Sequence, residues 1–554
     1  MTDLQAASGR RRWWALGALA LSVLVVGLDI FVLTLAIPTL SADLHASASD
    51  AQWFVAAYSL VLAAALLPAG LLGDRYGRRR LLTFALVLFG ISSLACAYST
   101  STGELIAARA ALGLAAAVIT PLALAVLPVM FTPDERPKAI AIVGGATFLG
   151  FPLGPIVGGW LLDHFWWGSV FLINLPIVVI ALVAVTRLMP ESRSEQPPRI
   201  DVPGVAISSL GLTGLTYGVI RAGQDGWSNG VAIAAMAAGA AVLVAFVGWE
   251  RRVTRRDGEP LVDLGLFRSA GFTWGTTLST MITFALFGIT FAMPQYFLDV
   301  RGLNSLASGI RLLSLIGGLI VGLGVGQRLQ AARPGRSGAP AREPLAGPKA
   351  VGAAGFAIMA VALAVGAGTT VTSGTGFLMA WFAVAGLGLG LALPTMLNAA
   401  LGALSPERSG SGSALISAMR QVGATIGVAV LGTVIATVYR DRLHVPALPA
   451  APAATARSGL AGGVAVAKLT RSADLLTAVR TSYTAGLDTM LWVCGGIAFA
   501  AAILAVLFLP RNAAGPAAAR PSAAGPAADG LSGAGEQSRP AGVAGPPGGA
   551  TQAE

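Results

Sequence analysis

The side chains that could do chemistry in this sequence are charged groups inside long apolar stretches. Asp29 lies in residues 28–38, where every other side chain is uncharged. Apolar surroundings favour the protonated form of a carboxyl group, which is the property that a proton carrier needs. The alternative is a structural aspartate that pairs with Arg109 or with a backbone group. We take Asp29 as the candidate proton-coupling residue and Arg109 as its candidate partner.

Three arginines, Arg109, Arg311 and Arg420, lie within other apolar stretches. Arg109 is about five residues, or roughly 8 Å by helical rise, from the outer end of the predicted span 104–128. It needs a partner or water at that depth, unless its side chain reaches back to the membrane interface. Arg420 has no acidic residue near it in sequence, so it could face a cavity, attract an anionic group or hydrogen-bond locally. With Asn174 and Gln295, Arg420 makes up our set of candidate cavity residues.

The composition requires most of the chain to lie in a membrane. Of its 554 residues, 55% are hydrophobic and only 11% are charged, and the mean hydropathy is +0.74. A soluble domain carries about 25% charged residues. The net charge of +11 does not indicate nucleic-acid binding, because the basic residues sit in short clusters between charge-free stretches. An anionic membrane surface is the better partner.

Several classes of function lack their signature residues. Cys96 and Cys494 lie in apolar stretches and provide neither a disulfide framework nor metal-ligand spacing. The sequence contains no phosphate-binding Gly-x4-Gly-Lys-Ser/Thr loop and no arrangement of a nucleophile with a base. We therefore expect neither an enzyme nor an ATP-driven pump, with no cofactor and no metal.

The elements that must position these residues are membrane-spanning helices. A span needs about 20 apolar residues, and fourteen stretches qualify. Most of the 37 Lys and Arg residues then fall on the cytoplasmic side, which places both termini in the cytoplasm. We predict an all-α membrane protein with six, two and six helices: a cytoplasmic N-terminus (1–13), a six-helix bundle (14–186), a linker with two extra helices (187–271), a second six-helix bundle (272–509) with a long outer loop (440–486), and a disordered cytoplasmic tail (510–554).

Glycines and prolines repeat at one constant offset along the chain. Because both copies run in the same direction across the membrane, they indicate parallel repeats related by an axis along the membrane normal. The matched pairs are Gly113 and Gly386, Pro121 and Pro394, Pro133 and Pro406, Gly150 and Gly423, Gly154 and Gly427, and Gly159 and Gly432.

A segment rich in glycine and arginine follows the second span. The arginines alone would indicate a generic anchor on the cytoplasmic side, but their spacing with Gly and Asp goes beyond that. The segment resembles motif A of the major facilitator superfamily, which implies a conformational latch that locks the two halves in the outward-open state. Its main charges would be Asp74 and Arg75. The residues that carry the resemblance are Gly70, Gly73, Asp74, Arg75, Gly77, Arg78 and Arg79.

The fifth span contains a second glycine-rich segment. Spacing by four puts Gly150, Gly154 and Gly158 on one helix face, where they permit close approach of a neighbouring helix. Pro155 removes a backbone hydrogen bond and is expected to bend the helix. Ordinary packing of small residues is the alternative. Together with Gly159, the segment resembles motif C, a signature of the antiporter subgroup, which implies export.

Two further segments resemble the same family. Residues 105–113, around Arg109, resemble motif B. Residues 28–38 resemble the helix 1 motif of the fourteen-helix drug:proton antiporters of the EmrB/QacA type. Asp29 matches that motif, whereas Phe31 and Thr34 stand where it usually has Thr and Asn.

The resemblance implies a proton-coupled secondary exporter of drugs, antibiotics or other amphipathic small molecules that works by alternating access. The alternative is a proton-coupled symporter that imports a small solute on the same fold. Motif C and the count of fourteen helices argue against it. We expect a monomer in the bacterial cytoplasmic (inner) membrane. Its partners would be a small-molecule substrate, protons and the lipid bilayer, with no nucleic acid.

Overall fold

The apolar stretches of the sequence form long helices in the computed structural model. It describes residues 9–132, 135–193, 201–256, 258, 260–330, 346–404, 409–444 and 448–510. Residues up to Pro516 form one unit and residues 517–554 a second. The second unit and residues 511–516 of the predicted tail lie outside the described residues.

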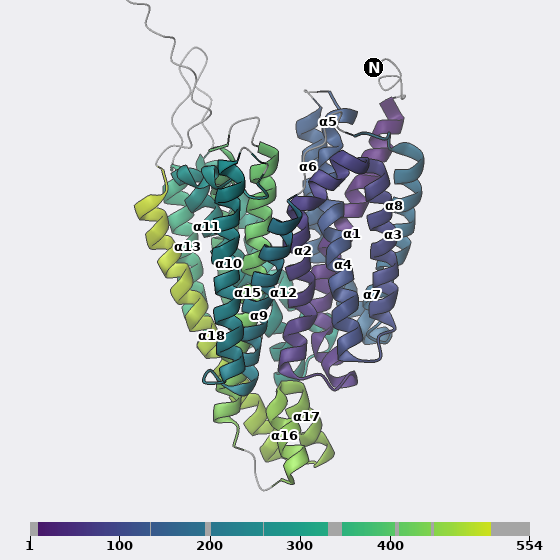
Figure 1. Cartoon of the computed structure of the whole chain (residues 1–554). Coiled ribbons are helices and arrows are strands. Elements are labelled where there is room, and N and C mark those ends of the chain that lie inside the picture. The colour runs from purple at the N-terminus through teal and green to yellow at the C-terminus, as the bar shows by residue number, and fades with distance from the viewer. Residues whose placement is uncertain are drawn as a thin grey trace, which may run out of the picture. The chain divides into compact units, whose positions relative to one another are not determined.

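The first six predicted spans form helices α1 to α8 (Figure 1). A capping box starts α2: the Ser47 hydroxyl accepts a hydrogen bond from the Asp50 N–H, and the Asp50 carboxylate accepts one from the Ser47 N–H. The helices are α1 (Gly9–Asp43), α2 (Ala48–Tyr76), α3 (Arg78–Ala97), α4 (Thr102–Ala125), α5 (Leu127–Met130), α6 (Arg136–His164), α7 (Ser169–Leu172) and α8 (Asn174–Leu188).

The two extra helices are α9 (Val202–Asp225) and α10 (Gly230–Arg255). Glycines bring them close together, since a Cβ at Gly239 would overlap the backbone of α9. Helix α9 also packs against α2 and against α15 (Ser409–Arg442). The pair therefore touches helices from both six-helix bundles.

The second bundle contains the remaining elements. Helices α11 and α15 run parallel, because Gly423 packs on Thr280 and Gly427 packs on Phe284. The elements before α15 are η1 (Leu264–Arg268), α11 (Ala270–Gln295), η2 (Tyr296–Val300), α12 (Ser305–Gln330), α13 (Pro348–Gly366) and α14 (Thr375–Leu401). Those after it are α16 (Ala450–Ser458), α17 (Leu460–Leu469) and α18 (Ala473–Phe508).

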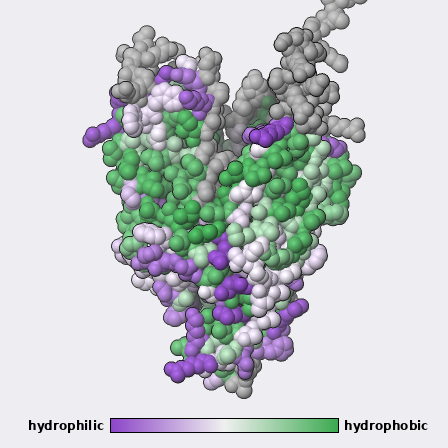
Figure 2. Space-filling view, turned by 180° about the vertical axis from the view of Figure 1, so that it is seen from behind, coloured by the Kyte–Doolittle hydropathy of each residue, from purple (hydrophilic) through white to green (hydrophobic). Residues whose placement is uncertain are grey.

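Among the described residues, 13 helices are long and apolar enough to cross a membrane. Helix α6 is not one of the 13, but it contains the predicted fifth span and its 29 residues are long enough to cross. Figure 2 shows hydrophobic residues gathered over the middle of the helices, with hydrophilic residues toward both ends. The chain is therefore a multi-pass, all-α membrane protein.

The segment 440–486, which we predicted as a long outer loop, is largely helical over its described residues 440–444 and 448–486. Helix α15 continues to Arg442, α16 and α17 follow, and α18 begins at Ala473. Figure 1 shows α16 and α17 beyond the ends of the long helices. The Tyr439 hydroxyl donates a hydrogen bond to the Ala456 carbonyl at 2.8 Å, and Leu460 joins the core cluster of the second bundle. Alanine-rich sequence forms helix readily once such packing is available.

A second acidic residue lies within a long helix of the second bundle. Helix α18 begins earlier than the span that the sequence predicts, and it contains Asp488. The Oδ1 atom of Asp488 is buried and has no hydrogen-bond partner among the described residues.

The two bundles meet through an apolar cluster. Leu33 and Ile37 of α1 pack with Phe291 of α11 and Val428 of α15. Polar groups buried near this cluster are therefore shielded from water on the side that faces it.

Candidate proton-coupling site and contacts between the bundles

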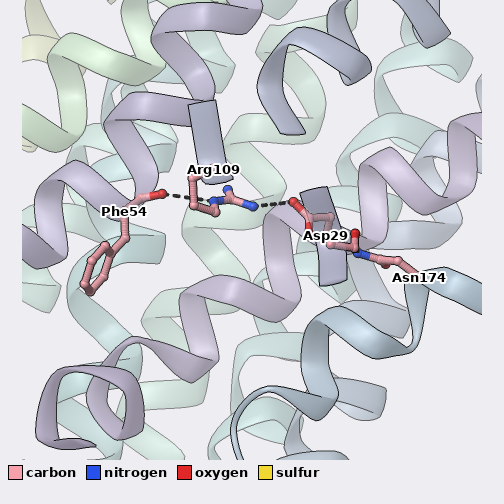
Figure 3. A network of polar contacts seen from close by, with 5 residues as sticks. Asp29, Phe54, Arg109 and Asn174 are labelled. Atoms are coloured by element: carbon pink, nitrogen blue, oxygen red, sulfur yellow. Dashed lines mark hydrogen bonds and ion pairs between the residues drawn. The ribbon is translucent and has the colours of Figure 1, made fainter. Parts of the chain in front are cut away.

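Asp29 and Arg109 form a buried ion pair. The Arg109 Nη1 atom lies 2.6 Å from Asp29 Oδ2, and each side chain is 1% exposed. Asp29 comes from the middle of α1 and Arg109 from α4 (Figure 3). The structure thus has the pairing that the sequence analysis gave as the structural alternative, and the Arg109 side chain does not reach back to the membrane interface.

Arg109 also connects this pair to α2. Its Nε atom donates a hydrogen bond to the Phe54 carbonyl at 3.0 Å, and its guanidinium lies over the Tyr58 ring at 4.4 Å. A cation over an aromatic face is attracted by the ring quadrupole. Three helices are therefore held by one guanidinium.

Asn174, at the start of α8, completes the network. Its Nδ2 atom donates to Asp29 Oδ1 and to Ser93 Oγ, both at 3.2 Å. Two polar atoms beside the ion pair, Asn174 Oδ1 and Tyr58 Oη, are buried and have no partner among the described residues. Such atoms usually bind a water molecule or form a hydrogen bond in another conformation of the protein.

The chemistry of this arrangement follows from its charges. A proton that binds Asp29 removes the negative charge and leaves Arg109 as a buried, unpaired cation. Removing one partner of a buried pair costs about 3–5 kcal/mol, so protonation favours movement of Arg109. Because Arg109 holds Phe54 of α2, that movement reaches a helix that packs against α15 of the other bundle.

The glycines of the fifth span pack on two different helices. A Cβ at Gly150 would lie 2.7 Å from Gly27 of α1, and one at Gly158 would lie 3.1 Å from Val32. Gly159 instead lies against Leu306 of α12. Gly154 and Pro155 are buried between these contacts. The segment therefore holds α6 against both the helix that carries Asp29 and a helix of the second bundle.

Asp163 extends this contact between the bundles. Its carboxylate accepts hydrogen bonds from the backbone N–H groups of Ser305 at 2.8 Å and Leu306 at 3.1 Å. These N–H groups begin α12, and a carboxylate at a helix N-terminus is stabilised by the helix dipole and by otherwise unpaired donors. Asp163 was missed by the sequence analysis, since it stands at the end of a span where a charge is ordinary.

The segment that resembles motif A contacts its own bundle. Gly77 ends α2 with φ +102, a conformation that favours glycine. Arg78 Nη1 donates to the Ala125 carbonyl at 2.9 Å, and Arg79 Nη2 donates to the Thr186 carbonyl. Gly70 has open space around it, Gly73 lies against Leu122, and Arg75 is exposed beside Tyr76. The side chain of Asp74 lies outside the described residues.

The three candidate cavity residues are not brought together. Asn174 is fully buried beside Asp29. Gln295 donates to the Phe291 carbonyl of its own helix, and Arg420 Nε donates to Thr283 Oγ1 at 3.3 Å. A cavity of about 250 Å³ between α12 and α14 is lined in part by Gln330 and Thr395, and none of the three residues lines it.

The sequence family described as the Major Facilitator Superfamily matches residues 19–428. The chain belongs to this superfamily. The match runs from α1 through the two extra helices to α15, so the ion pair and the contacts between the bundles all lie within it.

Two similar proteins are named as exporters. The chain is 32% identical to the tetracenomycin C resistance and export protein of Streptomyces glaucescens, over 90% of this chain and 91% of that protein. It is 34% identical to the multidrug efflux pump LfrA of Mycolicibacterium smegmatis, over 89% and 95%. The fold is similar to that of a bacterial homologue of the lysosomal transporter Spinster, with a TM-score of 0.63 at 15% identity over 91% of this chain and 98% of that one.

Sequence reasoning found the charged pair of this superfamily member and singled out Asn174 for another role, but it missed the other residues around the pair. Ser93, Tyr58 and the Phe54 carbonyl all contact the pair or its amide partner. A tyrosine in an otherwise apolar stretch was the one available signal. Hydroxyls and backbone carbonyls are too common in membrane helices to stand out.

Proposed function

We propose that the chain is a proton-driven secondary exporter of amphipathic small molecules in the bacterial cytoplasmic membrane. The single observation that carries the coupling proposal is the Asp29–Arg109 ion pair. The export direction is supported by the relatives named as a resistance and export protein and as an efflux pump, each matched over about nine tenths of both chains. The chain would act as a monomer with both termini in the cytoplasm.

In this proposal, residues 14–186 and 272–509 are the two moving bundles, and the helices within 187–271 accompany them. A proton that arrives from the outer side binds Asp29 and releases Arg109 from the ion pair. Arg109 then changes its contact with Phe54, and α2 shifts against α15. Loss of the proton to the cytoplasm restores the pair, so that each cycle exchanges protons for cargo.

Two contacts would set which side is open. Asp163, bound to the start of α12, would hold the outer ends of the bundles together. Its two hydrogen bonds would break when the outer side opens. The segment around Asp74 and Arg75 would hold the cytoplasmic side in that outward-open state. The second contact is proposed from the resemblance to motif A, and the first from the hydrogen bonds to Ser305 and Leu306.

The test is transport into inverted membrane vesicles with an imposed proton gradient, acid inside, with ethidium and pyrenebutyrate as fluorescent probes. The wild-type chain should accumulate at least one probe, and accumulation should collapse when the gradient is dissipated. Asp29→Asn should lower the gradient-driven rate at least about tenfold, since the amide cannot carry the proton. Asp43→Asn, at the exposed end of the same helix, is the matched control and should stay within about twofold.

Substrate exchange without a gradient separates lost coupling from lost folding. Asp29→Asn should still exchange labelled for unlabelled probe across the membrane. Gradient-driven accumulation that survives in Asp29→Asn would remove Asp29 from the coupling mechanism. Movement of probe in the same direction as protons would instead establish the symporter.

A further inference from the structure

Arg420 is a membrane-embedded cation for which the structure describes no anionic partner. It lies within α15, and its Nε atom donates a hydrogen bond to Thr283 Oγ1 at 3.3 Å. Thr283 is neutral, and its own hydroxyl donates to the Ser279 carbonyl. Among the described ion pairs none involves Arg420. Arg109, by contrast, has Asp29 as its counter-ion.

The Arg420 side chain does not reach back toward the start of its helix. The contacts of Gly423 with Thr280 and of Gly427 with Phe284 fix the register of α15 on α11. That register places the Arg420 backbone opposite Thr277, yet the side chain bonds Thr283, further along α11. The guanidinium therefore points away from the helix end at which both α11 and α15 begin, which is the opposite of an interfacial anchor.

The protein uses few of the hydrogen-bond donors of Arg420. The residue is half-buried. Helix α15 packs against α2, α9, α11 and α18, so little of its surface remains for lipid. A guanidinium has five donors, and the described hydrogen bonds use one of them. The remaining donors have no hydrogen-bond partner among the described residues.

The two bundles treat their embedded charges differently. Gly150 packs on Gly27 where α6 meets α1, and its repeat partner Gly423 packs on Thr280 where α15 meets α11. Asp29 and Arg420 therefore belong to corresponding helix pairs of the two bundles. In the first bundle the protein itself neutralises the charge. In the second bundle, a bound anionic ligand would neutralise the positive charge of Arg420.

We propose that Arg420, with Thr283 beside it, is the recognition point for an acidic group on the cargo, a carboxylate or an acidic phenol. The inference rests on the proposed export function and adds the chemical class of its substrate. A planar guanidinium binds a carboxylate through two parallel hydrogen bonds, and an embedded cation without a counter-ion is otherwise unfavourable. Amphipathic cargo with one acidic group satisfies both the apolar surroundings and the free donors.

The experiment compares two probes that share one apolar body. Pyrenebutyrate carries a carboxylate, and pyrenebutanol carries a neutral hydroxyl. Binding is measured on the full chain in lipid nanodiscs by energy transfer from tryptophan, with empty nanodiscs subtracted. The wild-type chain should prefer the acid by about tenfold to hundredfold, the range for a hydrogen-bonded charged group.

The variants locate the preference. Arg420→Gln should abolish the preference while pyrenebutanol still binds as in the wild type, which shows that the fold is intact. Arg420→Lys should keep part of the preference. Arg311→Gln removes another embedded arginine, whose Nη1 donates to the Ala307 carbonyl of its own helix, and should leave the preference unchanged.

Three outcomes would overturn the inference: a wild-type chain with no preference for the acid, including one that binds neither probe; a preference that persists in Arg420→Gln; or an equal loss in Arg311→Gln. Gradient-driven transport is a separate measurement. If it fails while the acid preference depends on Arg420, the export proposal falls and the anion site stands. If ethidium is exported and the acid is not preferred, the export proposal stands and the anion site is wrong.

Discussion

The Asp163 carboxylate and the Ser305 backbone tie one bundle to the other where α6 ends and α12 begins. The hydrogen bond from the Ser305 N–H is 2.8 Å long, and the neighbouring Leu306 N–H donates to the same carboxylate. The contact is polar, local and made by one side chain. It can be broken without removing any apolar packing.

Asp163→Ala should therefore shift the balance toward separation of the end of α6 from the start of α12 by about tenfold or more, because a hydrogen bond to a charged group contributes about 1.5–3 kcal/mol. Spin labels at the exposed positions 164 and 304 report the distance by electron-electron resonance. The native cysteines, Cys96 and Cys494, are buried and should remain unlabelled. Asp163→Asn keeps one acceptor oxygen and should have a smaller effect. An unchanged distance distribution in Asp163→Ala would mean that apolar packing alone closes this side.

The buried ion pair predicts strong coupling between two substitutions. Asp29→Asn alone should lower the free energy of unfolding by about 3–5 kcal/mol, because Arg109 is left charged and unpaired. The double variant with Arg109→Gln should be more stable than Asp29→Asn alone, since no buried charge remains. Thermal unfolding in detergent, followed by tryptophan fluorescence, measures all four chains. Simple additivity of the two losses would argue against a direct pair.

Gly150 should tolerate no larger side chain. A Cβ there would lie 2.7 Å from Gly27 and 2.8 Å from Leu28, so Gly150→Ala should force α1 and α6 apart and cost about 1–3 kcal/mol of unfolding free energy. Gly17→Ala is the matched control on α1, because nothing lies within 4 Å of its Cβ position. Equal stability of the two variants would show that α1 can shift to make room.

Substitutions at two glycines with positive φ can distinguish the cost of backbone strain from the cost of a side-chain clash. Gly77 has φ +102 and lies against Glu191, whereas Gly226 has φ +98 and nothing within 4 Å. Gly226→Ala should cost about 1 kcal/mol from its backbone conformation alone. Gly77→Ala should cost more, because the Glu191 carboxylate must also move. Thermal unfolding compares the two, and a smaller loss at Gly77 would contradict the contact.

The spans were predictable because each depends on a local run of apolar residues, and the pairing of Asp29 with Arg109 was one of two readings that the sequence allowed. Contacts that depend on register across the chain were not predictable. Nothing near Asp163 in sequence points to the N–H groups of α12, and nothing near Arg420 points to Thr283. The helices α16 and α17 were missed because alanine-rich sequence forms a helix only where the folded chain offers a surface such as Tyr439 to pack on.

In the proposed orientation, the hairpin of α16 and α17 lies in the outer aqueous phase, where an antibody can reach it. Gly459, between the two helices, lies against Ala48 at the start of α2, while α17 packs on α18. An antibody fragment that binds this hairpin would restrain the two bundles relative to each other without entering the bilayer. Such a fragment is expected to slow efflux of ethidium from intact spheroplasts. Undiminished efflux at a saturating concentration of the fragment would show that the hairpin moves with one bundle and does not restrain the other.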